Sequence, residues 1–277
     1  MKLIADSGST KVAWRAIKDD GSVIEITSEG INPVFQSKEA IETILRRDLK
    51  PILDMKIDEI FFYGAGVVAT EISATLSDVF NKVFPDAKCV AESDVLAAAR
   101  ALCGHKPGIS CIIGTGSNSC LYDGEKIIKN VKAGGFILGD EGSGGVLGRR
   151  FISDYIKGLL PQYIDEEFTR RYGLDYLSIV QKVYKEPVPS RFLASFSPFI
   201  LEYKKDPHIY SLIYSNFDNF FKRNIVHYDY KEYSVNIVGS IAFYYEDILR
   251  EVASANGVTI GKILKDPIDG LADYHKN

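Results

Sequence analysis

Cysteine is scarce in this chain of 277 residues, and nothing in its spacing suggests pairing. The sequence contains no C-x-x-C motif, and each cysteine lies in an apolar run, where a free thiol behaves as a small hydrophobe. This pattern excludes a disulfide scaffold and predicts buried, unpaired thiols. The cysteines are Cys89, Cys103, Cys111 and Cys120.

Long apolar runs and concentrations of positive charge are also missing. No stretch approaches the roughly 20 apolar residues that a membrane span requires. Met1 leads into a strand-like segment without the charged leader and apolar region of a signal peptide. The net charge is -4 with both signs scattered, so no basic stripe is available for a phosphate backbone. We therefore expect a soluble cytoplasmic protein with neither membrane nor nucleic acid as a partner.

The remaining composition is that of an ordinary globular protein. Hydrophobic residues make up 46% and charged residues 25% of the chain. At roughly 150 residues per domain, the length predicts two domains.

The periodicity and the turn signals predict an alternation of strands and helices in the first half. Ser37 is a plausible N-cap for the first helix because it directly precedes an apolar pattern of helical spacing. Three hairpin-linked strands should open the chain, followed by alternating helices and strands. The expected strands are residues 2–5, 11–17, 23–28, 59–63 and 88–91, and the expected helices are 38–53, 70–83 and 95–102.

The second half repeats this order of elements after a surface connection at residues 104–108. The expected strands are 110–113, 119–122, 126–131, 234–238 and 258–263, and the expected helices are 145–160, 241–255 and 268–275, with a mostly helical stretch up to 227. Two halves with the same order of elements indicate an internal duplication and an α/β fold.

One tight turn between strands in the first half has the composition of a phosphate site. Gly8 permits close approach of the backbone to an anion, and Ser9, Thr10 and Lys11 add donors. Asp6 could hold Mg²⁺ directly or through water. An ordinary hairpin turn would explain the same residues equally well. The turn is not a Walker A loop, because its lysine enters a strand and not a helix.

A second turn of the same kind lies in the second half. Gly114, Thr115, Gly116, Ser117 and Asn118 separate two strands. Taken alone, such a turn is more often a simple hairpin. Its recurrence in the second half favours a pair of turns that grip one polyphosphate.

Two acidic positions could carry chemistry. Asp94 follows a strand and precedes an Ala-rich helix, where it could cap the helix or accept a proton from an attacking hydroxyl. Asp140 lies in the Gly-rich segment 139–144, where acids could complement a helix dipole or accept hydrogen bonds from sugar hydroxyls. The glycine spacing there does not fit a dinucleotide-binding motif.

A last small-residue turn, Gly239 and Ser240, lies between a strand and a helix. It would admit a flat base close to the backbone, although a tight strand-to-helix turn would need the same residues.

In this order, the motifs resemble those of the N-acetylglucosamine kinase branch of the BadF/BadG/BcrA/BcrD ATPase family, over nearly the full chain. The resemblance implies two duplicated ribonuclease H-like domains of the actin-like ATPase type, with an active-site cleft between them. The domains would be residues 1–105 and 106–266, the second with a helical insertion at about 160–230, and 267–277 is a candidate to pack back on the first.

The resemblance also implies a role for each motif. The two turns look like phosphate motifs and the third like the adenosine motif, so ATP and Mg²⁺ are the expected cofactors and Asp6 the metal ligand. Asp94 would be the catalytic base. The expected nucleotide contacts are Gly8, Ser9, Thr10, Lys11, Thr115, Gly116, Ser117, Gly239 and Ser240. The expected sugar contacts are Asn32, Gly64, Asn118 and Asp140.

The implied activity is ATP-dependent phosphorylation of the 6-hydroxyl of N-acetylglucosamine or a related amino sugar, by an enzyme that often forms homodimers. One alternative is an ATPase that activates a dehydratase or reductase of the 2-hydroxyacyl-CoA or benzoyl-CoA type. Such activators use cysteines to bind an iron-sulfur cluster, and these cysteines form no recognisable ligand pattern. A sugar-responsive regulator is a third hypothesis, but no helix-turn-helix segment precedes the first strand.

Overall fold

A computed structural model of the chain describes residues 1–8, 11–33, 36–67 and 70–276. It divides into two compact units. The first comprises Met1–Lys106, Asp123–Ile127 and Asp266–Asn277, and the second Pro107–Tyr122 and Ile128–Lys265. Within the described residues, no helix combines the length and the apolar character needed to cross a bilayer.

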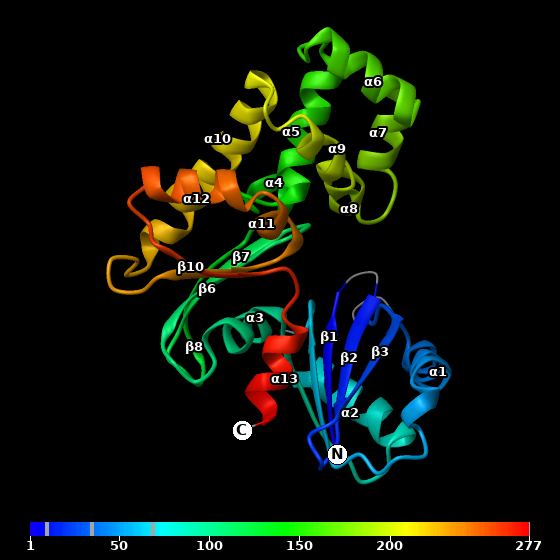
Figure 1. Cartoon of the computed structure of the whole chain (residues 1–277). Coiled ribbons are helices and arrows are strands. Elements are labelled where there is room, and N and C mark those ends of the chain that lie inside the picture. Colours follow the sequence, from blue (N-terminus) through cyan, green and yellow to red (C-terminus); the bar gives the residue numbers. More distant parts are fainter. Residues whose placement is uncertain (9–10, 34–35, 68–69, 277) are drawn as a thin grey trace. The chain divides into compact units, whose positions relative to one another are not determined.

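The first unit is built on a five-stranded mixed sheet with the order β3-β2-β1-β4-β5. β1 pairs antiparallel with β2 and parallel with β4, so the opening hairpin lies on one side of β1 and the parallel strands on the other (Figure 1). Its strands are β1 (Lys2–Ser7), β2 (Lys11–Ile17), β3 (Val23–Glu29), β4 (Glu59–Gly64) and β5 (Lys88–Ser93).

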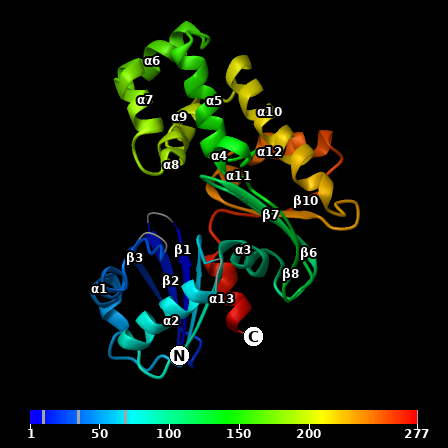
Figure 2. The same ribbon diagram turned by 180° about the vertical axis from the view of Figure 1, so that it is seen from behind.

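Helices cover both faces of this sheet because neighbouring strand residues point to opposite faces. Leu3 and Ala5 belong to the core that includes residues of α1 and α2, whereas Ile4 packs with residues of α3 and α13. The C-terminal helix therefore packs on the first unit, beside α3 (Figures 1 and 2). The helices are α1 (Lys38–Asp48), α2 (Thr70–Val83), α3 (Asp94–Cys103) and α13 (Ile268–Lys276).

The first helix is shorter than the periodicity predicts. Ser37 caps it as expected, since its side chain accepts a hydrogen bond from the Ala40 N–H, but α1 ends at Asp48. A 3₁₀ turn, Lys50–Ile52, follows and contains Pro51. Proline has no N–H to donate, so the helix could not continue through this position.

A polar cluster fixes α13 to the sheet. The Tyr63 hydroxyl lies 2.8 Å from Nε2 of His275 and accepts a hydrogen bond from Arg100 at 2.7 Å. The His275 ring also stacks on Phe61, with 3.8 Å between ring centroids. His275 is thus a buried structural residue.

The second unit repeats the sheet of the first. Its strand order is β10-β9-β6-β7-β8, in which β6 pairs antiparallel with β7 and parallel with β9, as β1 does with β2 and β4. The duplicated α/β fold expected from the sequence is therefore confirmed. The strands are β6 (Gly108–Ile113), β7 (Ser117–Tyr122), β8 (Ile127–Val131), β9 (Val235–Val238) and β10 (Ile260–Leu264).

One large aromatic-rich core holds the helices of the second unit on its sheet. The expected helix 241–255 is broken at Tyr245, a buried side chain whose hydroxyl donates to the Ser197 carbonyl. The helices are α4 (Gly135–Leu138), α5 (Gly144–Ile156), α6 (Gln162–Tyr172), α7 (Tyr176–Tyr184), α8 (Pro189–Ala194), α9 (Ser197–Glu202), α10 (Pro207–Arg223), α11 (Ser240–Tyr244) and α12 (Glu246–Ala255), with a 3₁₀ turn at Ile225–His227.

Candidate functional site

The parallel strands of the first unit bring several predicted site residues to one edge of its sheet. Ser7, Gly64 and Ser93 lie in register at the ends of β1, β4 and β5. Asp6 is the preceding residue of β1, because this strand runs two residues further than the sequence predicts. Asp94 directly follows β5. The edge thus carries two of the predicted acids and Gly64.

Asp94 is not the cap of α3. That role belongs to Ser93, whose hydroxyl accepts the N–H of Leu96, while Asp94 is the first residue of the helix. The capping explanation of Asp94 is therefore wrong. Burial raises the pKa of the Asp94 carboxyl, and backbone hydrogen bonds oppose that shift. A buried carboxyl of raised proton affinity suits proton transfer better than capping.

Asp6 lies in a strongly acidic environment. Burial raises the pKa of Asp6 to about 7, and the negative charges of Asp266 and Asp94 add to the shift, while Lys11 opposes it. A cation bound beside Asp6 would offset this concentration of negative charge. The sequence reasoning missed Asp266, because a single Asp-Pro before a terminal helix is indistinguishable from a helix start.

The first predicted phosphate turn is only partly described. The Gly8 N–H donates to the carbonyl of Lys11 at 3.0 Å, which closes the hairpin, and Lys11 begins β2. Ser9 and Thr10 lie outside the described residues.

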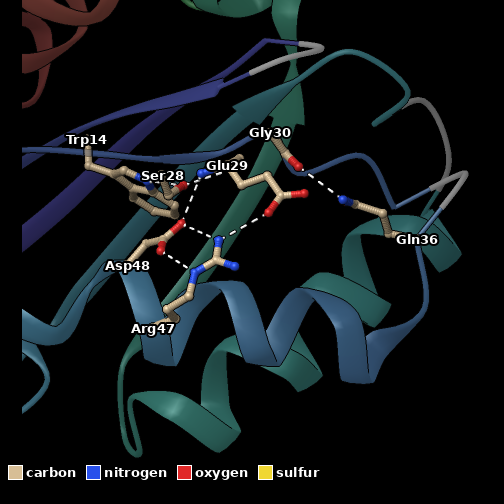
Figure 3. Close-up of polar contacts among 7 residues, drawn as sticks. All are labelled: Trp14, Ser28, Glu29, Gly30, Gln36, Arg47 and Asp48. Carbon is tan, nitrogen blue, oxygen red and sulfur yellow. Dashed lines mark hydrogen bonds and ion pairs between the residues drawn. The ribbon is translucent and has the colours of Figure 1, made fainter.

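The loop that carries Asn32 is held at the same edge of the sheet. The buried Ser7 hydroxyl donates to the Ile31 carbonyl at 2.7 Å. The Gln36 side chain spans the loop, since its amide donates to the Gly30 carbonyl at 3.0 Å and its oxygen accepts the Asn32 N–H at 2.7 Å. Figure 3 shows Gln36 reaching Gly30. The contact from Ser7 therefore holds the loop beside β1, and the contacts of Gln36 fix the backbone around Asn32.

In the second unit, the predicted phosphate turn is a tight hairpin between β6 and β7. The Gly114 N–H donates to the Gly116 carbonyl at 2.9 Å. The turn is shorter than expected, because Ser117 and Asn118 already belong to β7. The start of α5 packs on it, with the Gly145 N–H donating to the Thr115 carbonyl at 2.9 Å. The turn is thus rigidly supported.

Asp140 joins the Gly-rich loop to this turn. Its carboxylate accepts a hydrogen bond from the Ser117 N–H and lies against Gly116, where a Cβ would come within 3.0 Å of Oδ2. Burial raises the pKa of Asp140. The Ser117 hydroxyl donates to the Glu141 carbonyl at 2.8 Å. The N–H and the hydroxyl of Ser117 therefore both donate hydrogen bonds to the Gly-rich loop.

Asn118 is also engaged next to this turn. Its Oδ1 accepts the N–H of Ser119 and a hydrogen bond from Asn130, each at 2.9 Å.

The third turn needs glycine for a steric reason. Gly239 has φ +134°, and a Cβ there would lie 2.3 Å from the Ile113 carbonyl oxygen. The backbone of the turn therefore approaches the end of β6 closely, and Ser240, which begins α11, is exposed.

A cavity of about 520 Å³ brings the second and third turns together within this unit. Its other walls come from α8 and α9, in the helical region to which the sequence assigned no role. Ser197 is only 5% exposed, and its hydroxyl has no hydrogen-bond partner among the described residues. The cavity is lined by Gly114, Thr115, Arg191, Ala194, Ser195, Ser197, Pro198, Leu201, Ser240, Ile241, Tyr244 and Tyr245.

The described side chains include no group of three or more His, Cys, Asp or Glu residues able to hold a metal on their own. Cys111 and Cys120 are buried, while Cys89 and Cys103 are only partly buried. The expectation that all thiols are buried is therefore wrong for two of them.

Comparison with solved structures gives full-length matches. A proposed N-acetylglucosamine kinase from Porphyromonas gingivalis matches with 43% identity and a TM-score of 0.94, over 99% of this chain and 98% of that chain. A second proposed N-acetylglucosamine kinase, from Chromobacterium violaceum, matches with 17% identity and a TM-score of 0.75, over 99% and 98%.

A glucokinase of the ROK family from Streptomyces griseus, in complex with glucose and AMPPNP, has 14% identity and a TM-score of 0.57, over 98% of both chains. At this identity, as for the Chromobacterium protein, the likeness concerns the fold alone. A scan against protein-family models and a search of curated proteins gave no match.

Proposed function

Because the chain belongs to the N-acetylglucosamine kinase-like family with the actin-like ATPase fold, we propose that it is an ATP-dependent kinase that phosphorylates N-acetylglucosamine or a related amino sugar. The observation that carries this proposal is the cavity of about 520 Å³ between the turn at Thr115 and the turn at Ser240. Its volume lies in the range of small-molecule sites.

The cavity fits a nucleotide whose base enters between the helices and whose phosphates face the turn. Apolar side chains such as Ile241, Leu201 and Ala194 can enclose a flat ring, and the unpartnered Ser197 hydroxyl is a group that a base could satisfy. The exposed Thr115 and the backbone of Gly116 would contact phosphate oxygens, whereas Ser117 would support this turn through its hydrogen bond to the Gly-rich loop. Gly239 would let the nucleotide approach the end of β6.

The first unit would supply the groups for phosphoryl transfer. Asp94 would accept the proton of the sugar 6-hydroxyl. The hydroxyl oxygen would then bond to the γ-phosphorus of ATP while the bond between that phosphorus and ADP breaks. Asn32 and Gly64 of this unit would bind the sugar, as would Asn118 and Asp140 of the second unit. Asp6, with Asp266 beside it, fits a magnesium ion held through water, because a cation would offset the negative charge there. The metal would supply charge neutralisation of the polyphosphate.

The deciding experiment is ADP release by the purified chain with ATP, Mg²⁺ and a panel of hexoses and amino sugars, each beside a control without sugar. We expect release that depends on N-acetylglucosamine or a close amino sugar. Hydrolysis that proceeds equally without sugar, or no hydrolysis at all, would contradict the proposal.

A further inference from the structure

A second cavity in the second unit lies apart from the residues assigned to ATP and sugar. Its volume is about 360 Å³, and it is enclosed by α4, α5, α10 and the loop before α5. Figures 1 and 2 show α4, α5 and α10 side by side. It is lined by Ile137, Leu138, Gly139, Glu141, Val146, Arg149, Arg150, Asn216, Asn219 and Arg223.

The charge of this cavity is positive, since three arginines and one glutamate line it. The glutamate is already neutralised. Arg223 Nε lies 2.5 Å from one oxygen of Glu141, and Asn224 donates to the other at 3.2 Å. Arg149 donates a hydrogen bond to the Phe136 carbonyl at 2.8 Å. A carbonyl has no net charge, so this contact does not neutralise the guanidinium. An anion entering the cavity would therefore meet uncompensated positive charge.

Arg150 is the best-placed group for such an anion. It is partly buried on α5, and its hydrogen bond from Nη1 to the Leu212 carbonyl is long, at 3.4 Å. Burial lowers the pKa of Arg150, so its charge is poorly solvated where it lies. Asp154, one turn along the helix, attracts it but bonds His208 at 2.8 Å. A guanidinium in this state gains more from an anion than a solvated one does.

Two of the exposed residues that line the cavity are apolar. Ile137 and Leu138 on the short helix α4 are 69% and 78% exposed. Apolar groups beside arginines suit a ligand with an anionic group and an organic body, and they offer nothing to a bare inorganic ion.

We propose that this cavity binds an organic phosphomonoester, with Arg150 and Arg149 on the phosphate and Ile137 and Leu138 on the organic part. The site is distinct from the cavity that takes the nucleotide. The loop between them has two faces, because Asp140 points to the turn at Gly116 whereas Glu141 bonds Arg223.

The test is isothermal titration calorimetry of the full chain with phenyl phosphate, which is neither a sugar nor a nucleotide. Inorganic phosphate and phenol are the comparison ligands. We expect phenyl phosphate to bind more tightly than either, because each comparison ligand keeps only half of the recognised chemistry. No heat with phenyl phosphate would overturn the proposal.

Variants locate the binding. Arg150→Met should weaken the binding of phenyl phosphate about tenfold or more, because the variant loses a hydrogen bond to a charged group. Asn219→Asp places a negative charge on an exposed lining residue and should also weaken it, without threatening the fold. Ala194→Trp, in the nucleotide cavity, should leave it unchanged. Affinity that is kept in both of the first two variants, or lost in Ala194→Trp, would assign the binding elsewhere.

A regulatory consequence follows, and it rests on the proposed function. Asn216 accepts the Gly142 N–H and donates to the Ser143 carbonyl, so the wall of the cavity holds the loop that carries Asp140. Phenyl phosphate should therefore change the KM for the sugar, and Arg150→Met should abolish that change. Calorimetry needs no turnover, so it tests the site even if the kinase assay fails.

Discussion

The carboxylate of Asp140 accepts a hydrogen bond from the backbone N–H of Ser117, and this contact joins the Gly-rich loop to the turn between β6 and β7. A side chain expected to bind the sugar therefore also supports a turn expected to bind phosphate. The two roles can be separated because only the acceptor, and not the charge, is needed for the hydrogen bond.

Asp140→Ala should raise the KM for the sugar about tenfold or more and also raise the KM for ATP, because it leaves the buried Ser117 N–H without an acceptor. Asp140→Asn keeps an acceptor and should affect the sugar far more than ATP. Steady-state kinetics with each substrate varied would check this. If both variants leave the KM for the sugar unchanged, Asp140 does not bind it.

Asp94→Asn should lower kcat about 10²-fold or more with little change in the KM for ATP, because an amide cannot accept the proton of the hydroxyl. Ser93→Ala is the matched control. It removes the cap of α3 and should cost about 1 kcal/mol of stability, measured by urea unfolding, while most of kcat is retained. Comparable losses of kcat in the two variants would mean that Asp94 acts only through the helix start.

Ala194→Trp should fill the cavity next to Ser197 and raise the KM for ATP severalfold, with a smaller effect on the sugar. Leu177→Trp adds the same ring on α7, at a position that is 73% exposed, and should leave both KM values unchanged. The comparison is made by steady-state kinetics. An unchanged KM for ATP in Ala194→Trp would place the nucleotide base outside this cavity.

Local sequence signals predicted the strands well because alternation and turn residues act over a few positions. β2 and α2 begin and end where the sequence placed them. The repeated order of elements predicted the duplication, and the two sheets share one strand order. The end of α1 before Pro51 was missed because the apolar periodicity continues past it. The break at Tyr245 was missed because it accompanies a hydrogen bond to Ser197, a residue distant in the sequence.

The site was harder to predict wherever it depends on contacts between distant segments. Asp266 acts on Asp6 only because α13 returns to the first unit. Ser197 reaches the cavity through the packing of α9, which no local pattern encodes. For Gly239 the sequence left two explanations open, the approach of a flat base and a tight strand-to-helix turn. The closeness of Gly239 to the Ile113 carbonyl shows that the tight turn alone already requires glycine.

Acid should destabilise the first unit through His275. Burial lowers the pKa of His275 to about 4, and the charges of Arg100 and Lys2 contribute. The unfolded chain, with a pKa near 6.5, binds more protons than the folded one between these values, so stability is lost as the pH falls from about 6.5 to about 4. His275→Gln should flatten that part of the profile, measured by thermal melts at several pH values. An identical slope in the variant would assign the acid sensitivity to other groups.

Gln36→Ala should raise the KM for the sugar severalfold while kcat changes little. The variant removes the hydrogen bond between the Gln36 side chain and the Gly30 carbonyl (Figure 3). It also removes the one that the side chain accepts from the Asn32 N–H, so the loop that carries Asn32 loses both of these contacts. In the variant, the sugar has to order this loop when it binds. The free-energy cost of that ordering lowers the affinity for the sugar.

Arg47→Ala is the control for that variant, because it removes polar contacts from the same region without touching the loop. Arg47 bridges Glu29 and Asp48. The Arg47 and Glu29 side chains are exposed, and exposed ion pairs contribute little to stability. Its KM values should match those of the unchanged chain. A KM for the sugar that rises equally in both variants would show a general effect on β3 and α1, whereas a rise confined to Gln36→Ala assigns the sugar contact to the Asn32 loop.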